Sequence, residues 1–126
     1  MNPTKMYGPL PGGLHDDPRR SYTMASRYYT DPAIFEEEMD KIFACSWIFV
    51  GHESQVAEPG SYKTIEIADE SIALVRGRDG ELRCFYNVCQ HRAHRILQGE
   101  GKLKLTMTCP YHAWAYDFEG KLRTAR

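Results

Sequence analysis

The sequence predicts a mainly β fold, built from small antiparallel sheets with one helix near the N-terminus. Three observations carry this prediction. Apolar and polar residues alternate over several short segments between residues 62 and 118, as they do in half-buried strands. Turn-forming pairs, of which Asp79-Gly80 is the strongest, separate those segments. One stretch, which begins at residue 31, instead has the spacing of an amphipathic helix.

The N-terminal part divides into an arm and a helix. Residues 1–30 are predicted to form an extended arm, because prolines and glycines are frequent there, and residues 31–126 are predicted to form the domain. The helix should begin at Asp31 and Pro32, since Asp is a good N-cap and Pro a good first-turn residue, and should end near Cys45. Its predicted apolar face consists of Ile34, Phe35, Met39, Ile42 and Phe43.

Strands account for most of the chain after the helix. The apolar run 47–50 predicts a short buried strand. Further strands are expected over residues 62–67, 72–75, 82–88 and 102–108, and a last alternating segment runs from 114 to 118. Cys84, within one of these strands, and Cys45, at the end of the helix, are expected to be buried, because free cysteines usually behave as small apolar residues.

Two Cys-His pairs stand out, each directly after an expected strand. The first is Cys89-Gln90-His91. The second, Cys109-Pro110-Tyr111-His112, is separated from it by seventeen residues. Two thiolates and two imidazoles are the protein ligands of a Rieske [2Fe–2S] cluster, in which one iron binds both cysteines and the other binds both histidines. The predicted ligands are therefore Cys89, His91, Cys109 and His112, on two loops that neighbouring strands place side by side. No catalytic residue is predicted.

A structural zinc module with two Cys and two His ligands is the main alternative. Zinc motifs commonly leave about two to four residues between the first two ligands and about three to five between the histidines. Here each pair combines one Cys with one His, and the first pair encloses a single residue, so the cluster is the preferred interpretation. His94 is interpreted as a neighbour of the cluster, because the four ligand positions are already filled.

Charge and hydropathy restrict the class of protein. The net charge of −1 gives no reason to expect nucleic acid or an anionic membrane as a partner. No apolar run approaches the length of about eighteen residues that a membrane span requires, and residues 1–14 lack the apolar core of a signal peptide. The sequence therefore predicts a cytoplasmic protein whose cysteines serve metal binding more than disulfides.

Around the ligand pairs, segments 87–92 and 109–114 closely resemble the Rieske motifs of bacterial ring-hydroxylating oxygenases, in their large α subunit. The resemblance implies a Rieske-type antiparallel β sandwich of small sheets. It also implies transfer of single electrons from a ferredoxin, or from a flavin or iron–sulfur reductase, to a mononuclear non-haem Fe(II). That iron uses O2 for hydroxylation or oxidative N-demethylation. The implied partners include neighbouring oxygenase subunits, arranged in a trimer.

The resemblance also implies that the C-terminal catalytic domain is absent from this chain, because the sequence reaches Arg126 soon after the second pair. The chain would then be the electron-transfer part of an oxidoreductase, and a free-standing Rieske ferredoxin is the alternative. Neither loop has the additional cysteine of cytochrome bc-type Rieske proteins, and Trp114 stands where those proteins have a hydrogen-bonding Ser. A reduction potential near the lower end of the range of about −150 to +300 mV is therefore expected.

Two alanines set this sequence apart from many family members, which have Gly at the positions of Ala93 and Ala113. Because alanine is disfavoured at positive φ, ordinary backbone dihedrals are predicted for both residues. The pattern with alanine looks most like the branch that acts on quaternary ammonium compounds such as carnitine, glycine betaine and proline betaine.

Overall fold

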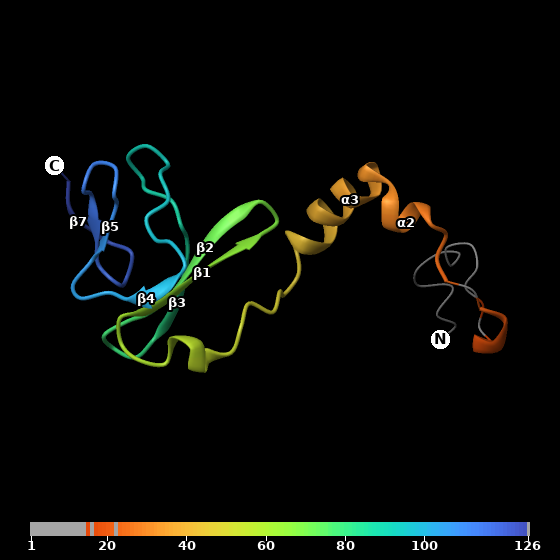
Figure 1. The fold of residues 1–126 in the computed structure, drawn as a ribbon, viewed down its shortest axis with the longest axis horizontal. Coiled ribbons are helices and arrows are strands. Elements are labelled where there is room, and N and C mark those ends of the chain that lie inside the picture. Colours follow the sequence, from red (N-terminus) through yellow and green to blue (C-terminus); the bar gives the residue numbers. More distant parts are fainter. Residues whose placement is uncertain (1–14, 16, 22, 126) are drawn as a thin grey trace. The chain divides into compact units, whose positions relative to one another are not determined.

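The computed structural model describes residues 15, 17–21 and 23–125, which form two compact units (Figure 1). One unit extends to Trp47 and the other comprises Ile48–Arg126. In this described part of the chain, no helix combines the length and the apolar character that crossing a bilayer requires.

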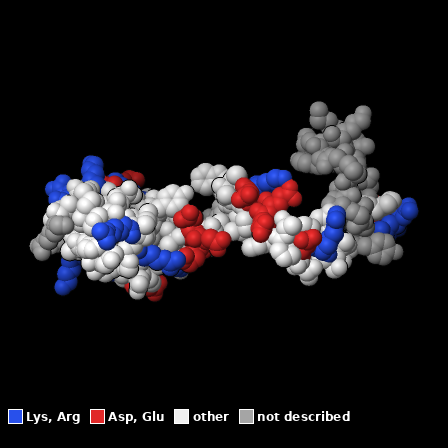
Figure 2. Space-filling view, turned by 90° about the horizontal axis from the view of Figure 1, so that it is seen from above, with Lys and Arg blue, Asp and Glu red and all other residues white. Residues whose placement is uncertain are grey.

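The first unit is helical (Figure 1). It contains the 3-10 turn η1 (Pro18–Arg20) and the short helix α2 (Arg27–Thr30), followed by α3 (Pro32–Glu38) and a π-helical turn, η2 (Met39–Phe43). The predicted N-cap is confirmed, because the Asp31 carboxylate accepts a 3.0 Å hydrogen bond from the Ala33 backbone N–H. Acidic side chains gather on this unit in Figure 2, and Glu36, Glu37 and Asp40 are exposed.

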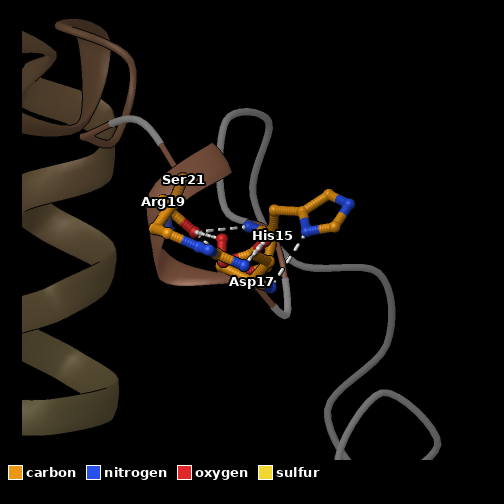
Figure 3. Close-up of polar contacts among 4 residues, drawn as sticks. All are labelled: His15, Asp17, Arg19 and Ser21. Atoms are coloured by element: carbon orange, nitrogen blue, oxygen red, sulfur yellow. Dashed lines mark hydrogen bonds and ion pairs between the residues drawn. The ribbon is translucent and has the colours of Figure 1, made fainter.

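The prediction of an extended arm is wrong where η1 and α2 form. Figure 3 shows the reason for η1: Asp17 accepts a hydrogen bond from the Arg19 backbone N–H, and the Ser21 hydroxyl donates to the His15 carbonyl at 2.7 Å. Pro18 favours this turn, since its fixed φ suits a first helical position. The predictions for residues 1–14, 16 and 22 lie outside the described residues.

The second unit contains two antiparallel sheets, so the predicted fold class is confirmed. The first sheet has the order β3-β2-β1-β4, with β1 (Ser61–Ile67), β2 (Glu70–Arg76), β3 (Leu82–Tyr86) and β4 (Glu100–Lys102). The second has the order β5-β6-β7, with β5 (Met107–Thr108), β6 (Ala115–Tyr116) and β7 (Leu122–Thr124). A 3-10 turn, η3 (Glu53–Val56), precedes β1.

One core joins the two sheets. It is formed by Ala73, Val75, Cys89, Leu97, Met107, Cys109, Tyr116 and Phe118. Both cysteines of the predicted metal site belong to this core, so the packing that stabilises the unit also holds two of the predicted ligands.

Three local predictions are wrong. Residues 47–50 form no strand, and Trp47 and Phe49 are exposed. The expected strand 102–108 is divided into β4 and β5, because the chain passes from one sheet to the other between them. Cys45 and Cys84 are both exposed.

The exposure of Cys84 follows from the orientation of β3. Leu82, Cys84 and Tyr86 all point away from the core, whereas Phe85 packs against it. The strand carries apolar residues on both faces, so alternation alone does not identify the inward face. Buried Asn87, just after the strand, belongs to the inward face together with Phe85.

Candidate metal centre

The two predicted ligand loops have the same backbone hydrogen bonds. In the first loop, the Cys89 N–H donates to the His94 carbonyl at 2.8 Å, and the Ala93 N–H donates to the Cys89 carbonyl at 2.9 Å. In the second, the Cys109 N–H donates to the Trp114 carbonyl at 2.8 Å, and the Ala113 N–H donates to the Cys109 carbonyl at 3.0 Å. Residues 89–94 and 109–114, called here the first and second loop, are therefore two copies of one backbone turn.

The dihedrals of the two alanines contradict the sequence prediction. Ala93 has a φ of 52° and Ala113 a φ of 57°, so both adopt the left-handed conformation. This conformation turns the chain back, which lets the following residue present its carbonyl to the cysteine N–H. The closing hydrogen bonds of each loop outweigh the steric cost of a left-handed alanine, which is about 1 kcal/mol.

The two loops bring the predicted ligands together in like pairs, cysteine beside cysteine and histidine beside histidine. The cysteine side is buried, since Cys89 is 3% and Cys109 2% exposed. The histidine side faces outward: His91 is exposed and His112 half-buried, and their ring centroids are 4.7 Å apart. The structure thus separates a sulfur pair in the core from an imidazole pair at the surface.

Hydrogen bonding favours the thiolate form of Cys89. Burial raises the pKa of this thiol, but the Tyr116 hydroxyl, the His91 amide, the neighbouring Cys109 side chain and the Arg92 amide together hold that pKa below its usual range. A thiolate is the form of cysteine that binds metal. The same surroundings therefore prepare Cys89 to act as a ligand.

The surroundings of His112 favour its neutral form. Burial, and then the positive charges of His91, Arg92 and His94, lower the pKa of the His112 imidazole. Neutral imidazole is the form of histidine that binds metal through a ring nitrogen. The two shifts therefore act in the direction that coordination needs, toward the thiolate at Cys89 and toward the neutral imidazole at His112.

Tyr116 contacts the candidate site and was not predicted from the sequence. Its hydroxyl lies 3.3 Å from Cys89 Sγ and accepts a 3.0 Å hydrogen bond from the Gln90 N–H. Since that N–H uses the oxygen as an acceptor, the hydroxyl hydrogen is free to point at the sulfur. Tyr116 lies on β6, directly after the second loop, so it connects one loop to the cysteine of the other.

Asn87 fixes the segment that follows the first loop. Its amide oxygen accepts from the N–H groups of Ile96 (3.1 Å) and Leu97 (2.9 Å), while its amide nitrogen donates to the Leu97 carbonyl (2.8 Å) and the Ser71 hydroxyl (3.2 Å). The side chain is 3% exposed. A buried amide with four partners holds both ends of the loop together.

The ligand set fits a two-iron cluster in its division between sulfur and nitrogen. Within the described ranges, no three side chains of Cys, His, Asp or Glu converge on a point that would hold a single ion. A [2Fe–2S] cluster requires only two protein ligands on each iron, and the buried cysteine pair and the outward histidine pair are suited to that division.

The amino-acid sequence is similar to those of known proteins. Residues 46–126 match the family described as "Rieske [2Fe-2S] domain". The chain is 52% identical over 117 residues to the carnitine monooxygenase oxygenase subunit of Escherichia coli K12, a match that covers 93% of this chain and 31% of the relative. It is 39% identical over 102 residues to the glycine betaine monooxygenase oxygenase subunit of Chromohalobacter salexigens, which covers 80% of this chain and 23% of that relative.

The fold is similar to a solved structure as well. The apo form of the quaternary ammonium Rieske monooxygenase CntA superposes with a TM-score of 0.81 at 47% identity, over 84% of this chain and 31% of that one. The chain thus spans between about a quarter and a third of the length of these relatives. Both comparisons agree with the resemblance to quaternary ammonium oxygenases.

Proposed function

The chain belongs to the Rieske [2Fe–2S] domain family, and from this premise we propose that it binds one such cluster and carries one electron at a time. Cys89 and Cys109 bind one iron, and His91 and His112 bind the other. One observation carries the proposal: two loops with the same hydrogen bonds bring together two buried cysteines and two histidines whose ring centroids are 4.7 Å apart.

The chain's own groups determine how this site behaves. When bound, the cluster supplies one-electron redox chemistry at a potential that its surroundings adjust. The core around Cys89 and Cys109 keeps water from the sulfur side, and the Tyr116 hydroxyl stabilises negative charge on Cys89. The exposed ring of His91 gives electrons a route to a partner at the surface. We place the potential near the lower end of the Rieske range.

We propose further that the chain serves a quaternary ammonium oxygenase. The supporting relatives are named as oxygenase subunits of carnitine and glycine betaine monooxygenases, and one similar solved structure concerns inter-subunit electron transfer. In this proposal the electron continues to a mononuclear non-haem Fe(II) in a catalytic domain, within a trimer of subunits. The reaction there is O2-dependent hydroxylation or oxidative N-demethylation.

The electron donor in this proposal is a ferredoxin or a flavin or iron–sulfur reductase with an acidic docking face. The exposed Arg92 lies beside His91, and Arg95 pairs with Glu66 at 2.9 Å. Residues 88–99 contain two arginines and no carboxylate, and since Glu66 pairs with Arg95, the positive charge that remains beside His91 is that of Arg92. Opposite charges accelerate encounter between partners.

The docking proposal has a direct kinetic test. Arg92→Glu is expected to slow reduction by an acidic donor by about tenfold or more at low salt, with a smaller effect at high salt. Arg20→Glu, in η1 of the other unit, is the matched control and should change the rate little. An equal effect of both variants would contradict a docking face beside His91.

Metal and sulfide analysis tests the cluster itself. We expect a brown protein with about two iron and two acid-labile sulfide ions per chain, and after reduction an EPR signal whose average g value is that of a histidine-ligated cluster. A colourless chain that contains zinc would refute the proposal and establish the zinc module instead.

A further inference from the structure

Five aromatic rings form a continuous row across the two loops. The row runs in the order Trp114, His91, His112, Tyr111, His94. The successive ring centroids are 4.8, 4.7, 3.8 and 5.6 Å apart. The two histidines proposed as ligands stand inside the row, and neither is at its end.

The two residues at the ends of the row occupy equivalent positions in the repeated turn. His94 is the residue whose carbonyl accepts from Cys89 in the first loop, and Trp114 does the same for Cys109 in the second. Each end residue contacts a ring of the opposite loop, since Trp114 stacks on His91 and His94 meets Tyr111. Because the two turns have the same backbone, each loop places one aromatic side chain against the other loop, Trp114 from the second and His94 from the first.

The contact between Trp114 and His91 is the closer of the two end contacts. The two rings are nearly parallel, with an interplanar angle of 7°. Trp114 is half-buried and packs against the core, whereas His91 is exposed. The indole therefore connects an exposed imidazole to the rigid interior, and offset stacking of this kind is one of the preferred arrangements of aromatic rings.

We propose that Trp114, and more weakly His94, are positioning residues that fix the ring planes of the two ligand histidines from across the loops. This inference rests on the proposed function. A single bond from a ring nitrogen to iron locates the nitrogen but leaves the ring free to rotate about that bond. Trp114 restricts that rotation for His91, and His94 acts on His112 through Tyr111, whose ring lies 3.8 Å from that of His112.

The geometry ranks the two positioning residues. The Trp114 contact is direct and parallel, whereas the contact between His94 and Tyr111 is longer and tilted by 51°. Loss of the Trp114 ring should therefore disturb the histidine orientation more than loss of the His94 ring. A stacked pair shifts the balance between ring orientations by about twofold to tenfold.

The test uses the full chain with its cluster reduced, and pulsed EPR that measures the hyperfine couplings of the histidine nitrogens. Trp114→Leu is expected to replace the single set of couplings of one histidine by a broad distribution, with the population of the original orientation reduced about twofold to tenfold. Trp114→Phe, which keeps a ring against the core, should restore most of the original signal. His94→Leu, at an exposed position, should broaden the couplings of the other histidine by less.

Trp47→Leu is the matched control, because Trp47 is the other tryptophan of the sequence and belongs to the helical unit. It should leave the couplings unchanged. If Trp114→Leu and Trp114→Phe both keep the wild-type couplings, the inference is wrong although the cluster assignment stands. If the wild-type chain shows no nitrogen coupling at all, the proposed function fails and this inference with it.

Discussion

The first and second loops have one backbone and different side chains. In both, the cysteine N–H is bonded to the carbonyl five residues on, and a left-handed alanine precedes that carbonyl. The histidine, however, comes two residues after Cys89 in the first loop and three residues after Cys109 in the second. The side chains two residues before each cysteine also differ, since Asn87 stands before one loop and Met107 before the other.

This difference separates two tasks. Backbone hydrogen bonds, which any sequence tolerating the turn can form, shape the two loops that carry the four proposed ligands. The neighbouring side chains then give the proposed ligands of the two loops different surroundings. Cys89 has a hydroxyl from Tyr116 beside its sulfur, and His91 is more exposed than His112. We therefore expect changes to the ligands to act alike in the two loops, and changes to their neighbours to act on one loop.

The largest effect should come from exchanging a ligand. His112→Cys and His91→Cys should each retain an iron–sulfur cluster, but the additional thiolate adds negative charge and should lower the potential toward about −400 mV, the value of all-cysteine ferredoxins. Redox titration followed by EPR measures this shift. His15→Cys, which lies in the helical unit, is the matched control and should keep the wild-type potential. A Rieske-type potential in His112→Cys would contradict the assignment of that histidine as a ligand.

Loss of the Asn87 amide should destabilise only the first loop. Asn87→Ala removes four hydrogen bonds and leaves buried backbone groups of Leu97 without partners, so unfolding should require about 3 kcal/mol less. Urea unfolding provides the measurement. Ser71→Ala removes only the longest of the four bonds and should cost about 1 kcal/mol or less. If Asn87→Ala and Ser71→Ala lower the free energy of unfolding by the same amount, the hydrogen bonds from Asn87 to Ile96 and Leu97 contribute little.

The hydroxyl of Tyr116 should make the two cysteines unequal. Tyr116→Phe removes the hydrogen bond to Cys89 and with it some stabilisation of the reduced, more negative site. If that bond is about 1.4 kcal/mol stronger in the reduced than in the oxidised cluster, the potential should fall by about 60 mV. Tyr62→Phe, whose hydroxyl bonds the Gln98 carbonyl, serves as the control. An unchanged potential in Tyr116→Phe would contradict a preferential stabilisation of the reduced site by this hydroxyl.

The smallest effect should be the same in both loops. Ala93→Gly and Ala113→Gly relieve the left-handed alanine but increase the entropy of the unfolded chain, so each should stabilise the protein by about 0.5 kcal/mol. Thermal unfolding of the two variants makes the comparison. Destabilisation by about 1 kcal/mol, as at an ordinary α or β position, would contradict the left-handed geometry.

The sequence contained enough information for the fold class, for a strand shortly before each of the two loops, and for the helix start at Asp31. Ligand spacing and short alternating segments are local features, so one sequence displays them directly. The ligand assignment itself stays a prediction. The inward face of β3 was not predictable in the same way, because Cys84 and Phe85 are both apolar and only the tertiary register distinguishes them.

Other features escaped prediction for related physical reasons. The left-handed alanines depend on two closing hydrogen bonds per loop, which outweigh the intrinsic preference of alanine. Tyr116 and the ring pair of Trp114 with His91 are contacts between loops. Tyr116 lies 27 positions from Cys89 in the sequence, and only the tertiary fold brings such distant residues into contact.

The central claim is that two histidines and two cysteines hold one cluster. Pulsed EPR of the reduced wild-type chain, grown with ¹⁵N-labelled histidine, tests it most directly. We expect two inequivalent histidine nitrogens coupled to the unpaired electron, one from each loop. No coupled nitrogen, or only one, would contradict the pairing of His91 with His112 on a single iron.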